Sequence, residues 1–238
     1  PSQNLRLNPF VYFRLLQPSG PAGRQAAALL RQLSEIIFWL YLAKMNVVSC
    51  TVIYAIQVLK WTPAQAGSLM SIWGVVQFLS MGTLSLAGHS QNRFLHDERL
   101  VNWIGIVGGF VGMVLFFFTV QGWTLALGMA VSAVSMVSLT AITGYAGRLV
   151  DRSMQGEVQG LLSSILAITE VLGPPIFGSM LQWAESRPSE EWWILNLPFL
   201  MGALSVLAAM FCSYGLPHSS KAAEACREDR CRLIAETF

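Results

Sequence analysis

The chain alternates long apolar blocks with short polar segments. Six blocks stand out, and they cover residues 36–59, 66–87, 100–120, 123–146, 158–181 and 192–215. Each block holds about 20 residues or more, enough at ~1.5 Å per residue to cross a hydrocarbon core of about 30 Å. Gly, Ser, Thr or Pro interrupts every block, as packed membrane helices tolerate. The strict apolar–polar alternation of membrane strands is absent. The pattern therefore predicts an all-α membrane protein with six transmembrane helices.

The composition excludes several other classes of protein. Of 238 residues, 54% are hydrophobic and 12% are charged, whereas soluble domains carry about 25% charged residues. The net charge of +2 is too small to indicate nucleic-acid binding. No P-loop, HExxH or Gly-x-Ser-x-Gly motif occurs, and the four cysteines and three histidines are scattered. The sequence thus predicts neither an enzyme nor a metal or cofactor site.

The basic residues give the bundle an orientation. Twelve of them fall on one side of a six-span zigzag, and they are Arg6, Arg14, Arg24, Arg31, Arg93, Arg99, Arg148, Arg152, Lys221, Arg227, Arg230 and Arg232. The opposite loops carry only Lys60 and Arg187. By the positive-inside rule both termini face the cytoplasm, or the equivalent stroma or matrix. We expect a cytoplasmic-side leader at 1–34, a six-helix bundle at 35–217 and a polar, mobile tail at 218–238.

Two charged side chains lie inside the apolar blocks. Glu170 is in the fifth block and Lys44 in the first, and an ionisable group in a membrane span costs roughly 3 kcal/mol. Counted from the inner face, the two lie at depths that differ by ~6 Å, so a pair is geometrically possible. One interpretation makes Glu170 a proton carrier or cation contact, with Lys44 as its charge partner or an anion contact. The other is a structural ion pair, or Lys44 extending toward the interface.

Uncharged polar residues supply further candidates for a solute or proton pathway. Gln77 lies in the second block, Asn46 in the first, and Ser164 and Thr169 in the fifth. All four are expected either to line a cavity or to form hydrogen bonds between helices, and Ser and Thr can also bond their own helix backbone.

Two small-residue patterns concern helix shape and packing. Gly173-Pro174-Pro175 predicts a kink or break in the fifth helix, because each proline removes a backbone donor and clashes with the preceding turn. A break there would let one half-helix pivot, and a fixed kink is the alternative. In the third block, the face formed by Gly105, Gly108, Gly109 and Gly112 predicts a close helix contact.

An internal repeat connects the two halves of the chain. A shift of 93 residues lays Gly67-Ser-Leu-Met-Ser-Ile72 on Gly160-Leu-Leu-Ser-Ser-Ile165, and it pairs Gln77 with Glu170 and Gly109 with Gly202. Chance agreement between two apolar helices is the alternative. A three-span repeat must invert its topology, so the pattern predicts two inverted three-helix repeats, which are typical of secondary transporters.

The fifth block also carries a family resemblance. Gln159-Gly160, Ser163-Ser164, Gly173-Pro174-Pro175 and Gly178 together resemble the eleventh helix of major facilitator superfamily transporters, in particular drug/proton antiporters related to tetracycline efflux proteins. Asn8-Pro9 and the arginine-rich leader resemble the central loop between the two halves of such proteins. The resemblance implies that residues 1–217 correspond to a C-terminal six-helix half. The chain departs from the family in holding six spans where a complete member has twelve, and in the degenerate loop Gly88–Arg93.

Two functions follow from these features. The first is transport of a small organic solute by alternating access, with proton exchange as an option. This function requires a missing N-terminal half, a partner chain or a homodimer mate, because a solute site would lie between two halves. The second is a non-transporting scaffold subunit of a larger membrane complex. For both functions we expect the chain to lie in a lipid bilayer and to have no nucleic-acid partner. The chain begins at Pro1, which predicts a processed or partial chain.

Overall fold

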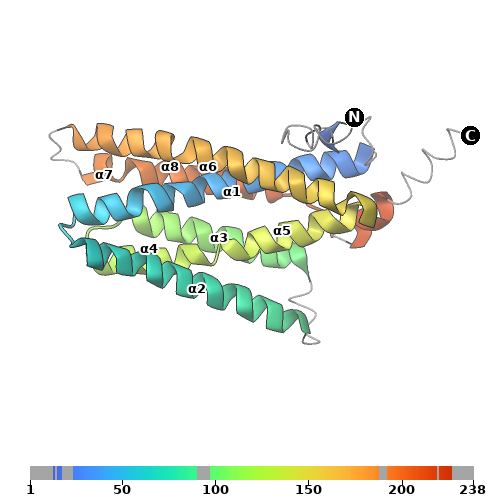
Figure 1. The fold of residues 1–238 in the computed structure, drawn as a ribbon, viewed down its shortest axis with the longest axis horizontal. Coiled ribbons are helices and arrows are strands. Elements are labelled where there is room, and N and C mark those ends of the chain that lie inside the picture. Colours follow the sequence, from blue (N-terminus) through green and yellow to red (C-terminus); the bar gives the residue numbers. More distant parts are fainter. Residues whose placement is uncertain are drawn as a thin grey trace, which may run out of the picture.

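The computed structural model describes residues 13, 15–17, 24–89, 97–187, 192–218 and 220–226. The elements in chain order are α1 (Arg24–Gln57), α2 (Pro63–His89), α3 (Glu98–Phe117), α4 (Gly122–Ala133), α5 (Met136–Leu149), the 3-10 helix η3 (Arg152–Met154), α6 (Gln155–Glu185), α7 (Trp192–Leu195) and α8 (Leu197–Ser213) (Figure 1). Each predicted apolar block coincides with one long helix or with two consecutive helices, so the prediction of an all-helical protein is confirmed.

Several helices have the dimensions of membrane spans. Within the described part of the chain, four helical stretches are long and apolar enough to cross a bilayer, namely Arg24–Gln57, Glu98–Phe117, Gly122–Leu149 and Arg152–Glu185. The last helix, α8, is apolar but has 17 residues, which is ~26 Å at the helical rise. Helix α2 has 27 residues. The presence of membrane-capable helices is confirmed, and the count of six spans stays a prediction.

The helices form an elongated bundle with α1 in a central position (Figure 1). Helix α1 packs against α6 and α8, and the α4–α5 pair packs against α3 and α2. Helices α3 and α8 join the two groups. Two of the largest buried side chains meet at that junction, where the Phe116 and Phe199 rings stack with centroids 5.2 Å apart. Between helices in lipid, such dispersion contacts supply much of the association energy.

The glycine face of α3 makes the predicted close helix contact. A Cβ atom at Gly105 would lie 2.6 Å from the Ser138 backbone nitrogen, and one at Gly112 would lie 2.7 Å from that of Ser132. This face meets the junction of α4 and α5, where the amides of Val134 and Ser135 bond to carbonyls three residues back. The fourth predicted span is therefore two helical segments joined by a tighter turn.

The first helix begins earlier than the sequence indicates. Because α1 starts at Arg24, residues 24–34 of the predicted leader form its first turns. Leu30 and Leu33 are fully buried there. The buried face of α1 therefore extends into the segment where Arg24 and Arg31 lower the hydropathy. Residues 1–12 and 18–23 of the leader, and Ser90–His96 of the loop that includes Gly88–Arg93, lie outside the described residues.

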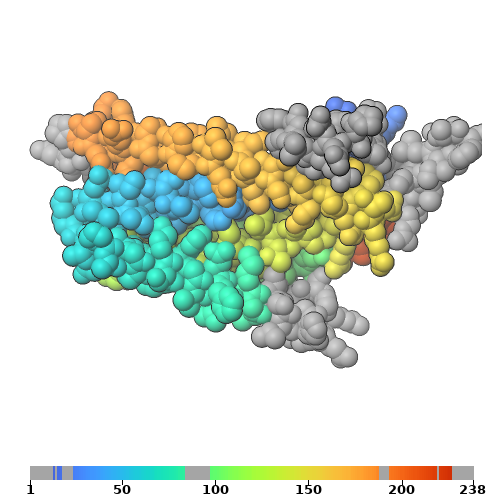
Figure 2. All heavy atoms as spheres, in the orientation of Figure 1, coloured from blue at the N-terminus to red at the C-terminus, as the bar shows by residue number. Residues whose placement is uncertain are grey.

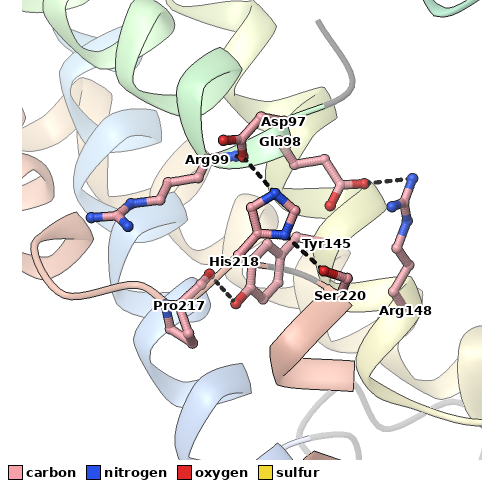
Figure 3. A network of polar contacts seen from close by, with 8 residues as sticks. All are labelled: Asp97, Glu98, Arg99, Tyr145, Arg148, Pro217, His218 and Ser220. Atoms are coloured by element: carbon pink, nitrogen blue, oxygen red, sulfur yellow. Dashed lines mark hydrogen bonds and ion pairs between the residues drawn. The ribbon is translucent and has the colours of Figure 1, made fainter. Parts of the chain in front are cut away.

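The segment after α8 packs onto the end of the bundle where α3 begins and α5 ends. The Tyr145 hydroxyl donates to the Pro217 carbonyl (2.8 Å), and His218 lies 3.8 Å from Asp97 and 2.9 Å from the Ser220 hydroxyl (Figure 3). Residues 220–226 are helical, with Ala222 and Cys226 buried. This part of the predicted polar tail is therefore helical and packed, the mobility of the tail stays a prediction, and residues 227–238 lie outside the described residues.

Candidate functional site

Three polar side chains connect α1 with α6 inside the apolar part of the bundle. The Tyr41 hydroxyl donates a hydrogen bond to Glu170 Oε1 at 3.0 Å. The Lys44 ammonium in turn donates to the Tyr41 oxygen at 2.9 Å. The phenol oxygen therefore lies between a carboxylate and an ammonium group, and we call the three residues the Tyr41 network.

The geometry of α1 places two of these side chains together. Tyr41 and Lys44 are three residues apart, so they lie on one face of the helix. The Lys44 ammonium also lies 4.2 Å from the centre of the Tyr41 ring and 5.8 Å from that of Trp73 on α2. Both distances fall within the range of cation–π attraction. Lys44 thus extends from α1 toward Trp73 on α2.

A close helix contact brings Glu170 within reach of Tyr41. Gly173, one turn beyond Glu170 on α6, lies against Met45, one turn beyond Tyr41 on α1. A Cβ atom at Gly173 would collide with the Met45 side chain. The absence of a side chain at Gly173 lets the two helix backbones approach closely. The glycine of the Gly-Pro-Pro sequence therefore has a packing role beside the site.

The predicted association of Glu170 with Lys44 takes an indirect form. No ion pair within 4.0 Å joins the two among the described residues, and Tyr41 bridges them instead. The sequence alone does not single out Tyr41. One feature of the sequence could have indicated it. Tyr41 lies three residues before the only lysine of its apolar block, and a hydroxyl in such a block needs a hydrogen-bond partner.

Three other predicted pathway residues bond to backbone atoms. The Asn46 amide is fully buried and donates to the Pro198 carbonyl (2.6 Å), which joins α1 to α8. The Ser164 hydroxyl donates to Gly160, and the Thr169 hydroxyl to Leu166, within α6. These contacts are the interhelical and intrahelical bonds that the alternative interpretation expects.

Gln77 lies on α2, one helical turn beyond Trp73. It is half-buried and forms no hydrogen bond with another described residue. Because residues four apart share a helix face, Gln77 and Trp73 point to the same side of α2. Gln77 is therefore a polar group on the Trp73 side of α2, and it is not part of the Tyr41 network.

Pro174 and Pro175 lie inside a continuous helix. Helix α6 runs from Gln155 to Glu185 through both prolines, so the helix does not end there. A bend or pivot at this position stays a prediction. Both prolines are exposed on the surface of the chain.

The Tyr41 network reaches the surface of the chain at Glu170, which is exposed. On the face seen in Figure 2, α6 and α2 lie on either side of α1. The exposed side chains near Glu170 on α6 are apolar, and they include Val171 (71% exposed), Leu172 and Ile176. In these apolar surroundings the Tyr41 hydroxyl supplies the Glu170 carboxylate with a hydrogen-bond donor. Among the described residues, no group of three or more His, Cys, Asp or Glu side chains is placed to hold a metal ion.

Comparison with known proteins identifies the class to which this bundle is related. The chain is related to transporters of the major facilitator type. Tetracycline resistance protein, class C, of Escherichia coli is 23% identical over 148 residues, which cover 62% of this chain and 36% of that protein. Tetracycline resistance protein, class G, of Vibrio anguillarum is 24% identical over 207 residues, or 87% of this chain and 50% of that protein.

A second group of relatives comes from animals. The Hippocampus abundant transcript 1 protein of Mus musculus is 23% identical over 202 residues, covering 76% of this chain and 40% of that protein. No family model matches the sequence. The chain thus spans between about a third and a half of the length of these relatives.

Proposed function

We propose that this chain forms one six-helix half of a secondary transporter, which moves a small organic solute by alternating access. Glu170 takes up and releases the coupling proton, and the six spans are α1, α2, α3, α4–α5, α6 and α8. The observation that carries the proposal is the hydrogen bond between Tyr41 and Glu170 (3.0 Å) in the middle of membrane-length helices. Ionisable groups in such positions are expensive and typically mark ion or substrate pathways.

The packing of the helices supports two inverted repeats. The shift of 93 residues relates α1 to α4–α5, α2 to α6, and α3 to α8. If the two repeats are equivalent, the packing of α1 on α8 and α6 should have a counterpart in the packing of α4–α5 on α3 and α2. Both sets of contacts occur. The matched glycines Gly109 and Gly202 both lie in close helix contacts. Equivalent contacts in the two repeats are expected if each arose from one ancestral three-helix unit.

The distribution of charge supports a cytoplasmic location, or an equivalent one, for both ends of the bundle. The start of α3 and the end of α5 meet through the ion pair between Glu98 and Arg148 (3.0 Å), and the segment after α8 packs at the same end. Five of the six described arginines belong to this end, namely Arg24, Arg31, Arg99, Arg148 and Arg152, whereas Lys60 and Arg187 lie at the other. The positive-inside rule assigns the arginine-rich end to the cytoplasmic side.

A second six-helix half completes the proposed transporter. The exposed apolar residues around Glu170 on α6, and those on α2 such as Val75 and Phe78, are suited to lipid or to another helical half. The relatives are two to three times as long as their matched parts. The second half is an N-terminal segment of the same protein, a partner chain or another copy of this chain.

The test is proton-driven solute flux in liposomes that contain the protein carrying this chain. Glu170→Gln removes the titrating group but keeps the shape of the side chain. We expect the substitution to abolish the response of flux to a pH gradient, while solute exchange without a gradient continues. Glu157→Gln is the matched control, because Glu157 lies exposed in the first turn of the same helix.

The outcomes distinguish the alternatives. Equal pH responses in wild type and Glu170→Gln would show that Glu170 carries no coupling proton. An absence of flux for every solute in a broad panel, with stable co-purification of a larger membrane complex, would favour a scaffold subunit.

A further inference from the structure

Lys44 has hydrogen-bonding capacity that the described chain leaves unused. An ammonium group has three N–H donors, and Lys44 donates to one oxygen, that of Tyr41 (2.9 Å). Its other close neighbours are the ring faces of Tyr41 and Trp73. The side chain is half-buried beside the apolar residues Leu40 and Val47. A cation with unused donors in such surroundings favours an additional oxygen ligand.

A small cavity adjoins this ammonium group. The cavity has a volume of about 10 Å³, and its walls come from α1, α2, α3, α8 and the α4–α5 junction, including Lys44, Trp73, Gly109 and Ser135. A space of this size holds about one water molecule. It therefore suits one oxygen atom of a ligand head group, and the body of the ligand would lie outside it along α2, beside Trp73 and Gln77.

Of the two charged residues in the Tyr41 network, Lys44 lines the cavity and Glu170 does not, so the cavity favours an anion over a cation. The faces of Tyr41 and Trp73 that could attract a cationic solute already hold the Lys44 ammonium. A second cation beside Lys44 would experience like-charge repulsion. An anionic oxygen would receive charge-assisted hydrogen bonds from Lys44, which are the stronger kind.

We propose that Lys44 is the head-group contact of a solute site, and that the solute is a small organic anion with a carboxylate and an aromatic or flat apolar body. The carboxylate bonds to Lys44, the body packs on Trp73, and Gln77 supplies a polar contact further along α2. The inference rests on the proposed function, since it names the class of solute that the transporter half recognises.

Binding of benzoate to the protein carrying this chain tests the inference without requiring transport. The protein is placed in nanodiscs, and binding is measured by calorimetry at constant ionic strength. Benzamide serves as the neutral counterpart and benzylamine as the cationic one. We expect benzoate to bind at least about tenfold more tightly than benzamide, since removing one member of a desolvated charge pair typically costs that much or more.

Substitutions assign the effect to Lys44. Lys44→Gln is expected to remove the preference for benzoate, while Lys44→Arg retains it and shows that the bundle still folds around a cation. Lys60→Gln is the matched control, because Lys60 is an exposed lysine at the outer end. No benzoate binding to the wild type, equal binding to Lys44→Gln, or tighter binding of benzylamine would each overturn the inference. Lysine-dependent benzoate binding without any solute flux would instead overturn the proposed function and leave the anion site standing.

Discussion

Tyr41 and Glu170 are 129 positions apart in the sequence and are joined by a hydrogen bond of 3.0 Å between α1 and α6. The same phenol oxygen accepts a hydrogen bond from Lys44. Protonation of Glu170 would weaken its bond with Tyr41, because a neutral carboxyl group is a poorer acceptor than a carboxylate. The contact therefore provides a route by which the charge of Glu170 affects both the packing of α1 on α6 and the environment of Lys44.

Replacement of Tyr41 by Phe tests this bridging role. The substitution removes the only oxygen partner of Lys44 among the described residues and the hydroxyl that faces Glu170. We expect a loss of stability of about 1–3 kcal/mol, the usual cost of leaving a polar group without its partner. Thermal unfolding in nanodiscs measures it. The double variant with Glu170→Gln should lose less than the sum of the single variants, since the two substitutions break the same contact.

Tyr54→Phe is the control for Tyr41→Phe. Tyr54 is a buried tyrosine on the same helix, and its hydroxyl donates to the Thr119 carbonyl at 3.2 Å. Its substitution should lower stability, yet it should be additive with Glu170→Gln. Additivity of both tyrosine variants with Glu170→Gln would contradict a special connection between Tyr41 and Glu170.

The close contact of Gly173 with Met45 yields a second prediction. In Gly173→Ala the added methyl group would meet the Met45 side chain, which forces α1 and α6 apart and lengthens the Tyr41–Glu170 contact. Overpacking of this kind typically costs about 1–3 kcal/mol. Gly178→Ala, in the same helix but with no atom within 4 Å of the added carbon, should leave the melting temperature unchanged or raise it slightly, because Ala favours helix. Equal melting temperatures for the two variants would show that the contact is not tight.

The sequence alone predicts the helices better than it predicts the site. Apolar blocks locate the helices because both lipid and the bundle interior require apolar side chains. The start of α1 is missed, since Arg24 and Arg31 lower the hydropathy of a segment whose Leu30 and Leu33 are buried. The break between α4 and α5 is missed as well, because Val134 and Ser135 carry no helix-breaking signal of their own.

For the site, the two charges are visible in the sequence but the connection between them is not. Glu170 and Lys44 stand out because ionisable residues are rare in apolar blocks. Tyr41 does not, because an aromatic residue in such a block is common. Its role depends on how closely α6 approaches α1, which Gly173 determines through a contact with Met45 that no local pattern reveals.

The ion pair between Glu98 and Arg148 predicts an asymmetric response to substitution. The Glu98 side chain is only 13% exposed and that of Arg148 is 56% exposed, with 3.0 Å between Glu98 Oε1 and Arg148 Nη2. Arg148→Gln leaves a largely buried carboxylate without its cation, whereas Glu98→Gln leaves an arginine that water can solvate. We expect Arg148→Gln to lower the free energy of unfolding by about 1 kcal/mol or more, after allowing for solvent screening at Arg148. Glu98→Gln should lower it by less. Unfolding of the single and double variants measures this, and Glu98→Gln should partly rescue Arg148→Gln. A larger loss in Glu98→Gln would contradict it.

The packing of the segment after α8 depends on Tyr145, whose hydroxyl donates to the Pro217 carbonyl at 2.8 Å (Figure 3). In Tyr145→Phe this bond is lost, and we expect the segment after α8 to detach more often from the end of the bundle where α3 begins and α5 ends. Cys226 reports the change, because its side chain is 1% exposed in the packed state. With the other three cysteines replaced by Ser, the rate of maleimide labelling of Cys226 should rise several-fold in Tyr145→Phe, since a lost hydrogen bond of about 1 kcal/mol shifts a local opening equilibrium by roughly fivefold.

Tyr214→Phe is the control, as Tyr214 is 81% exposed. Rapid labelling of Cys226 in the unsubstituted background, or equal rates in the two tyrosine variants, would show that Tyr145 does not hold this segment in place.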